Sequence, residues 1–114
     1  MDWQIEYYSD IGGGEPVKNF IDNQSLDAQV EIMHVIGLLQ EFALNLRYPY
    51  VVKIGKTGIR ELRIHHGSDY YRIFYFAFTG RKFVLLHAFL KKTRKTPIRE
   101  LEIAIRRMND YERH

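Results

Sequence analysis

Two glycine-led turns constrain the fold of the stretch from Ile59 to Lys95 more than any other feature of this 114-residue chain. The stretch contains three runs rich in β-branched and aromatic residues, at Ile59–His65, Tyr70–Phe78 and Phe83–Leu90. The loops between these runs begin with Gly67 and Gly80. A glycine that leads a two-residue loop suits a type II′ turn, whose twist matches that of the flanking strands. The stretch therefore predicts a three-stranded antiparallel meander.

The same turns predict how the strands pair. If Gly67-Ser68 and Gly80-Arg81 are the loop pairs, Arg63 directly faces Arg72, and Arg72 faces Phe89 on the next strand. Side chains alternate between the two faces of a strand. The face that we predict to be the core side holds Leu62, Ile64, Tyr71, Ile73, Tyr75, Ala77, Val84, Leu86, Ala88 and Leu90. The other face holds Glu61, Arg63, His65, Tyr70, Arg72, Phe74, His87, Phe89 and Lys91.

The opposed arginines indicate an anion site on the second face. Like charges placed directly opposite each other in a ladder are destabilising. An anion over the pair would relieve that repulsion, because a guanidinium group fits phosphate oxygens in a bidentate way. Neighbouring aromatic rings on this face can stack on nucleic-acid bases. We therefore predict that this face is the working surface. A salt bridge from Arg63 to Glu61, or to an acid on a helix, is the alternative.

Composition and charge narrow the class of protein. The length corresponds to one ordinary domain, so we predict a single domain over residues 1–114. The absence of cysteine excludes disulfides, thiolate metal sites and a cysteine nucleophile. No apolar run approaches the ~20 residues of a membrane span, and the first residues do not resemble a secretion signal. We therefore expect a cytoplasmic protein with no membrane partner.

The net charge is +3, and basic residues concentrate between residues 81 and 106. This distribution favours RNA or DNA as a partner, with a merely solvated surface as the alternative.

The N-terminal part of the chain predicts a strand and two helices. Residues 2–8 alternate like a strand with one wet face, placing Trp3, Ile5 and Tyr7 on the inner side. Pro16 begins a short helix, and Ser25 is a good N-cap for a longer helix that runs to about Leu46. The broad apolar side of this second helix comprises Leu26, Val30, Ile32, Met33, Ile36, Gly37 and Leu39. We predict that the two helices form a hairpin across one face of the sheet.

The segments that flank the meander complete an α+β fold. Residues 51–54 are either a short strand or an extended link. Thr96 and Pro97 predict the N-cap and first position of a C-terminal helix. The predicted order is β-α-α-β-β-β-α with an antiparallel or mixed sheet.

The histidines do not predict a metal site. His65 and His66 are adjacent, so on a strand they point to opposite faces, and His87 lies two strands away. No acidic cluster completes a coordination shell. We therefore expect neither a metal nor another cofactor.

Metal-free cleavage of RNA fits the residues better. This reaction needs a base for the 2′-OH proton, cations for the charge that grows on phosphorus, and an acid for the leaving 5′-oxygen. Arg63, Arg72, Lys91 and Lys92 are the candidate cations. His87 is the candidate base or acid, because the reference pKa of histidine is about 6.5. The alternatives are a packed strand histidine for His87 and a solvated strand end for the two lysines.

Three segments of the chain resemble a known family. ELRI, YRIFYFAF and VLLHAFLKKTRKTPIRELEIAIRR are similar to toxins of type II toxin–antitoxin modules, in the HigB-like, phage-derived branch of the RelE/ParE superfamily. The likeness covers roughly Val51 to Tyr111. Its most specific part is the block F-x-K-K-x-x-K-T-P-x-x-E, which is read here as Phe89, Lys91, Lys92, Lys95, Thr96, Pro97 and Glu100.

The resemblance implies a RelE-like fold and a cytoplasmic ribonuclease that cuts mRNA in the ribosomal A site and inhibits translation without a metal. It also implies a HigA-like antitoxin with a helix-turn-helix domain. The toxin itself would then contact operator DNA only through this antitoxin. The family places basic site residues at positions that match Arg63, Arg72, Lys91 and Lys92, and often adds a C-terminal Tyr or His, here Tyr111 or His114. Further candidates for substrate binding are Lys53, Tyr70, Phe74, Phe89, Arg94, Lys95 and Tyr111.

Two other functions remain open at the level of sequence. A ParE-like relative would block DNA gyrase through protein contacts and cleave nothing. A second alternative is a nucleic-acid-binding relative that has lost nuclease activity. The arginine and lysine cluster favours the nuclease, because ParE-type members tend to lack such a set.

Overall fold

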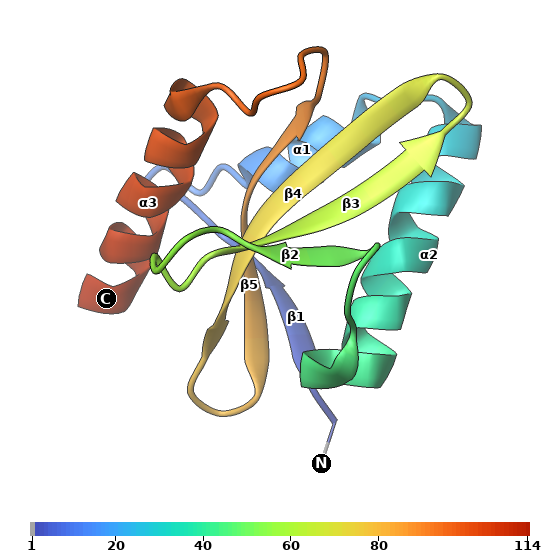
Figure 1. The fold of residues 1–114 in the computed structure, drawn as a ribbon. Coiled ribbons are helices and arrows are strands. Elements are labelled where there is room, and N and C mark those ends of the chain that lie inside the picture. The colour runs from blue at the N-terminus through green and yellow to red at the C-terminus, as the bar shows by residue number, and fades with distance from the viewer. Residues whose placement is uncertain (1) are drawn as a thin grey trace.

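A five-stranded mixed sheet with helices on both faces makes up the computed structural model, which describes residues 2–114 (Figure 1). The strands are β1 (Gln4–Tyr7), β2 (Val51–Lys53), β3 (Arg60–His66), β4 (Asp69–Phe78) and β5 (Lys82–Leu90), in the spatial order β1-β5-β4-β3-β2. The helices are α1 (Pro16–Asp22), α2 (Leu26–Phe42) and α3 (Ile98–Arg113), with a 3-10 turn η1 (Ala43–Asn45) after α2. β1 pairs in parallel with β5, and the other pairs are antiparallel. The predicted α+β class with a mixed sheet is confirmed, but the predicted order β-α-α-β-β-β-α has one strand too few, because the segment left open between strand and link is the edge strand β2.

The β3–β4 hairpin has the predicted register. His66 pairs with Asp69 across the loop of Gly67 and Ser68, and Arg63 pairs with Arg72. Gly67 has a φ of 61°, whereas Ser68 does not have a positive φ. This combination fits the type II′ turn, in which only the first loop residue needs the left-handed region.

The β4–β5 hairpin departs from the predicted register at an irregularity between Phe74 and Tyr75. The loop contains three residues, 79–81, because Phe78 pairs with Lys82. A shift of one residue moves every following side chain to the other face of the sheet. The predicted sides of Val84 and Leu86 are therefore wrong. Both residues face α3, while their neighbours Phe83 and Leu85 face α1 and α2.

Two hydrophobic layers cover the two faces of the sheet. The larger layer lies between the sheet and the α1–α2 pair and includes Val17, Ile32, Leu39, Leu62 and Ile73. The smaller layer lies between the sheet and α3 and includes Phe74, Phe76, Leu86, Phe89 and Ala104. The face that was predicted to be open is therefore half covered by α3, and only its polar end, which carries Glu61, Arg63 and Arg72, extends beyond the helix.

Helix α2 begins as predicted but is apolar on two sides. The hydroxyl of Ser25 accepts a hydrogen bond from the backbone N–H of Ala28 at 3.2 Å, which confirms the predicted N-cap. The helix ends at Phe42, four residues before the predicted end, and Ala43 has a φ of 53°. Ile32, Ile36 and Leu39 are buried as predicted. The predicted core positions Leu26, Val30 and Met33 are exposed instead.

The N-terminus of α3 differs from the prediction in its cap. The helix starts at Ile98 with Pro97 in the cap position and no side-chain cap. Thr96, the predicted cap, directs its hydroxyl to Glu61 Oε2 at 3.5 Å. A buried carboxylate needs partners more strongly than an exposed helix end does, which accounts for this choice. None of the helices within residues 2–114 has both the length and the apolar character that a membrane span requires.

Candidate nucleic-acid interface

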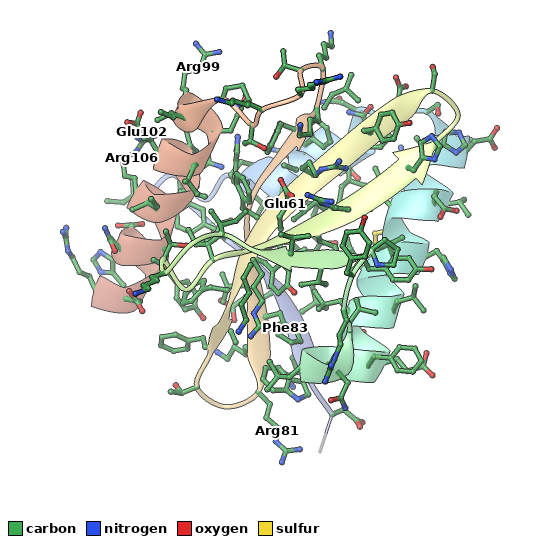
Figure 2. All side chains as sticks on the ribbon, viewed as in Figure 1. Glu61, Arg81, Phe83, Arg99, Glu102 and Arg106 are labelled. Atoms are coloured by element: carbon green, nitrogen blue, oxygen red, sulfur yellow. The ribbon has the colours of Figure 1, made fainter. Side chains whose placement is uncertain are left out.

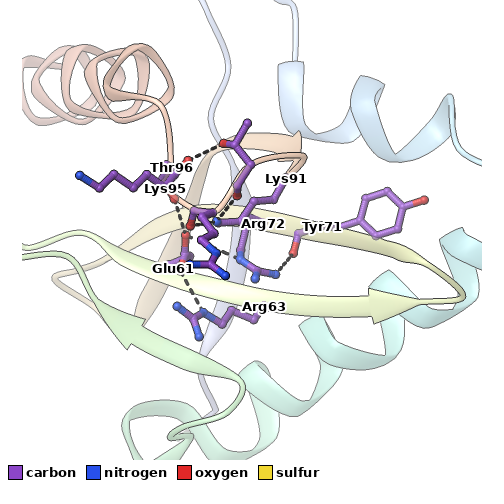
Figure 3. Close-up of polar contacts among 9 residues, drawn as sticks. Glu61, Arg63, Tyr71, Arg72, Lys91, Lys95 and Thr96 are labelled. Atoms are coloured by element: carbon purple, nitrogen blue, oxygen red, sulfur yellow. Dashed lines mark hydrogen bonds and ion pairs between the residues drawn. The ribbon is translucent and has the colours of Figure 1, made fainter.

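Glu61 lies at the centre of the polar end of the sheet. Its carboxylate is almost completely buried, with a residue exposure of 2%. Oε1 lies 3.0 Å from Arg63 Nε, and Oε2 lies 3.8 Å from Arg72 Nε and 3.5 Å from the Thr96 hydroxyl (Figure 3). These partners come from β3, β4 and the β5–α3 connection. One buried carboxylate therefore joins three segments of the chain.

The directly opposed arginines are thus separated by a carboxylate of the protein itself. Glu61 offsets part of the repulsion expected between like charges across a ladder, and the alternative of a salt bridge from Arg63 to Glu61 is correct. Two guanidinium groups and one carboxylate leave an excess of one positive charge. The pair therefore still attracts an anion, although it does not depend on one for stability.

The two arginines differ in accessibility. The side chain of Arg63 is 34% exposed and that of Arg72 only 11%. Burial lowers the pKa of Arg72, while the charge of Glu61 acts in the opposite direction. Arg72 donates a hydrogen bond to the carbonyl of Tyr71 at 3.0 Å, but its Nε makes none. The predicted working face therefore offers Arg63 to a ligand more readily than Arg72, whose guanidinium group is largely buried beside Glu61.

The connection after β5 supplies most of the free positive charge. Lys91 Nζ donates to the carbonyls of Thr93 at 2.6 Å and Arg94 at 2.5 Å, so this ammonium group holds the loop in shape (Figure 3). Lys92, Arg94 and Lys95 are exposed, and among residues 2–114 none of them has an ion-pair partner. We refer to residues 91–95 as the basic loop.

The accessible aromatic surface is smaller than predicted. Tyr70 is 47% exposed, its ring stacks on His65 at 4.5 Å, and the Arg72 guanidinium carbon lies 6.0 Å from its centroid. Phe74 is fully buried and Phe89 nearly so, with their rings 5.4 Å apart beneath α3. The prediction that these two phenylalanines stack on bases is wrong.

His65 is an additional surface residue that was not among the candidates. The predicted register already opposes His65 to Tyr70, and this pairing was the available signal. Both rings line a hollow of about 280 Å³ together with Arg63 and Arg72. The exposed stacking surface therefore lies next to the cations.

His87 is bonded on both sides of its ring. Its Nε2 lies 2.5 Å from Glu100 Oε1, and its Nδ1 lies 3.3 Å from a terminal nitrogen of Arg107. A guanidinium group can only donate, so Nδ1 accepts and Nε2 carries the proton that is donated to Glu100. Burial lowers the pKa of His87, Glu100 opposes this effect, and Arg107 adds to it. This geometry supports the alternative of a packed strand histidine, here one that anchors α3 to β5.

Two other candidates lie away from the cluster. Tyr111 packs against Phe76 and Phe78 at centroid distances of 5.8 and 5.0 Å. Phe78 is six residues from Arg72 along β4, a separation of about 20 Å. Lys53 pairs with Arg60 on β2 and β3, and Arg60 lies on the face opposite that of Glu61 because successive side chains alternate. The structure therefore brings neither residue to Glu61.

The assembled surface can bind phosphate through charge and bases through stacking. Among residues 2–114, no three His, Cys, Asp or Glu side chains are grouped so that they could hold a metal ion. Arg63 and the His65–Tyr70 stack line one hollow together with Arg72, and the basic loop begins beside it, where the backbone N–H of Lys91 donates to the carbonyl of Tyr70 at 2.7 Å.

Comparison with known protein families gives a match over most of the chain. The family described as "Phage derived protein Gp49-like (DUF891)" matches residues 19–109. No curated protein matches the chain. The matched range includes Glu61, Arg63, Arg72 and the whole basic loop, and it therefore covers the surface described above.

Proposed function

Because this chain belongs to the phage-derived Gp49-like family, whose members are RelE-like toxins, we propose that it is a toxin that cleaves mRNA on the ribosome. Membership of this family implies that the chain is the toxin-like component of a toxin–antitoxin pair and that its partner is an antitoxin. Our proposal is more specific. The mRNA is cut in the ribosomal A site, and a HigA-like helix-turn-helix antitoxin inhibits the toxin and makes the contacts to operator DNA.

One observation supports phosphate chemistry more than any other. Arg63 and Arg72 are held by a single buried carboxylate, next to a loop with three unpaired cations. Charges that are fixed before the substrate arrives stabilise a developing negative charge without reorganisation. Glu61 supplies this fixation, and the remaining excess positive charge is available to a phosphate group.

The proposed reaction is an internal transfer at phosphorus. The 2′-hydroxyl of RNA gives its proton to water and its oxygen attacks the adjacent phosphorus, while the bond from phosphorus to the 5′-oxygen breaks and that oxygen takes a proton from water, which yields a 2′,3′-cyclic phosphate and a free 5′-hydroxyl. Arg63 and Lys92 contact the non-bridging oxygens, where negative charge accumulates. Arg72 and Lys91 act indirectly. Arg72 fixes the position of Glu61, and Lys91 holds the basic loop through its backbone carbonyls. Because side-chain cations supply the positive charge, the proposed reaction uses no metal.

The Arg63→Gln variant tests this proposal in a translating system. We expect wild-type protein to produce codon-phased 5′ ends on mRNA bound to ribosomes, and a chelator to leave the rate unchanged. Loss of one charge-stabilising group typically costs about 10²–10³ in rate, so cleavage by Arg63→Gln should fall by that order. The matched control is Arg106→Gln, which removes an exposed arginine on the outer side of α3 (Figure 2).

Each contrary outcome identifies an alternative. Gyrase-linked DNA breaks with intact mRNA would replace the proposal by the ParE-like function. Ribosome binding without any cleavage by the wild-type protein would identify a nucleic-acid-binding relative that lacks nuclease activity.

A further inference from the structure

A second pair of like charges is directly opposed on the other face of the sheet. Lys53 of the edge strand β2 is the ladder partner of Arg60 on β3. Arg60 precedes Glu61, so its side chain lies on the opposite face from Glu61 and Arg63. This pair is therefore separate from the surface built around Glu61.

No carboxylate offsets this second pair. Lys53 and Arg60 together line two adjacent hollows of about 330 and 260 Å³. Arg47 lines the first hollow and Lys56 the second, and neither hollow is lined by Asp or Glu. Within the described part of the chain, none of these four cations is in an ion pair. The repulsion that Glu61 relieves on one face is thus left unrelieved on the other.

Arg60 is nevertheless held in position. It hydrogen-bonds the hydroxyl of Tyr75, a residue in the core beneath it. Burial raises the pKa of Tyr75 to about 12, although Arg60 acts in the opposite direction. The phenol therefore stays neutral at physiological pH. It orients the guanidinium group without cancelling its charge.

We propose that Arg47, Lys53, Lys56 and Arg60 form a second binding site for the sugar–phosphate backbone of RNA, apart from the site of cleavage. The two hollows share the Lys53–Arg60 pair, so the four charges follow one another along the edge of the sheet. Such a series suits the regularly repeated charges of a nucleic-acid backbone. The choice of RNA as the nucleic acid rests on the proposed function.

An exposed ring beside these charges favours a nucleic acid over an acidic peptide. Tyr48 lines the first hollow together with Arg47 and is 77% exposed. A free aromatic ring next to a basic groove provides a stacking platform for a base.

The position of this site indicates what it contributes. β2 is the outer strand of the sheet, and Arg63 of the neighbouring strand β3 bonds through its backbone N–H to Tyr50, just before β2. An RNA that passes around this edge contacts both surfaces. The second site therefore adds affinity and orientation, while the groups that touch the reacting phosphate are on the other face.

The Arg47→Gln/Lys53→Gln double variant tests this site, because it leaves Arg60 bonded to Tyr75. The probe is a fluorescent single-stranded RNA oligonucleotide with 2′-O-methyl groups, which lacks the attacking hydroxyl and stays intact. Binding is measured by anisotropy over a range of salt concentrations. Each phosphate contact to a single strand contributes about 0.7 to the slope of log affinity against log salt. We therefore expect the double variant to reduce the slope by about 1.4. The matched control Arg106→Gln should leave the slope unchanged.

The outcomes separate this inference from the proposed function. An unchanged salt slope in the double variant, with cleavage lost in Arg63→Gln, would overturn the second site and leave the nuclease intact. A reduced slope in the double variant, together with no cleavage of mRNA by the wild-type protein, would overturn only the nuclease. In a further contrary outcome, a poly-glutamate peptide displaces the oligonucleotide in proportion to its charge, while Tyr48→Ala leaves oligonucleotide binding unchanged. This pair of results would identify an acidic protein segment, and not RNA, as the ligand of the second site. In the cleavage assay, the double variant should weaken binding of mRNA but retain the rate at saturation.

Discussion

Glu61 has the most connections of any side chain in the candidate site, since it contacts both arginines and Thr96. A buried charge without a partner is costly, and the same holds for two opposed guanidinium groups that lose their common counter-ion. The residues of this site consequently serve folding and, under the proposed function, phosphate binding as well. Substitutions here have to be judged by stability as well as by activity.

Glu61→Gln should therefore destabilise the fold. Removal of one partner of a buried ion pair typically costs about 3–5 kcal/mol, and the two arginines would then repel each other without relief. Urea denaturation measures this loss as a lower free energy of unfolding. Glu102→Gln, on the exposed side of α3 (Figure 2), is the control and should change stability by no more than about 0.5 kcal/mol. A fully stable Glu61→Gln would show that the arginines are held by other contacts.

The aromatic residues should separate into a binding residue and a core residue. Tyr70→Ala removes an exposed ring that stacks on His65, so we expect weaker RNA binding, by about 1–3 kcal/mol, with an unchanged thermal midpoint. Phe74→Ala opens a cavity in the layer under α3 and should cost about 3–5 kcal/mol of stability. Calorimetry and oligonucleotide binding distinguish the two. A Phe74→Ala protein that is stable but fails to bind RNA would restore the original interpretation of that ring.

At the level of elements, α3 is attached to the sheet by polar contacts along its length. Glu100 accepts a hydrogen bond from Nε2 of His87, Arg107 donates to the carbonyl of Leu86 at 2.8 Å, and Asp110 accepts from the hydroxyl of Tyr8 at 2.6 Å. Protonation of His87 would keep the contact with Glu100 but would place a buried charge there and remove the Nδ1 acceptor of Arg107, so this attachment responds to pH.

Acidification should weaken the attachment of α3. The pKa of His87 is lowered in the folded protein, so between that value and the unfolded value near 6.5 the unfolded chain binds more protons. Stability is therefore fully present above pH ~6.5 and is lost as the pH falls through the folded pKa. Unfolding at pH 5 and pH 7.5 measures the difference, and His87→Gln should reduce it. An equal difference in His87→Gln would assign the pH dependence to other groups.

The elements also show where sequence patterns suffice and where they fail. The β3–β4 register follows from Gly67, because a two-residue loop leaves one pairing. The β4–β5 register fails at Phe74 because a three-residue loop and an irregular pairing occur together, and neither has a distinct sequence signature. Helix α2 is apolar on two sides, so its periodicity cannot tell the buried Ile32 from the exposed Val30.

The candidate site was predictable to a similar degree. The opposition of Arg63 and Arg72 follows from the turn, and the contact of Arg63 with Glu61 was one of two alternatives. The role of Lys91 could not be predicted, because its partners are backbone carbonyls of a loop. The burial of Phe74 and Phe89 depends on where α3 lies over the sheet, which no local pattern specifies.

On the scale of the whole molecule, the parallel pairing of β1 with β5 joins the beginning of the chain to residues 82–85 (Figure 1). The ring of Trp3 stacks on Phe83 at 4.3 Å, so the first strand has no place to dock until β5 exists. During synthesis, the nascent polypeptide cannot complete its sheet before β5 has left the exit tunnel. Under the function proposed above, the chain would thereby remain harmless to the ribosome that makes it until residues 82–85 have emerged.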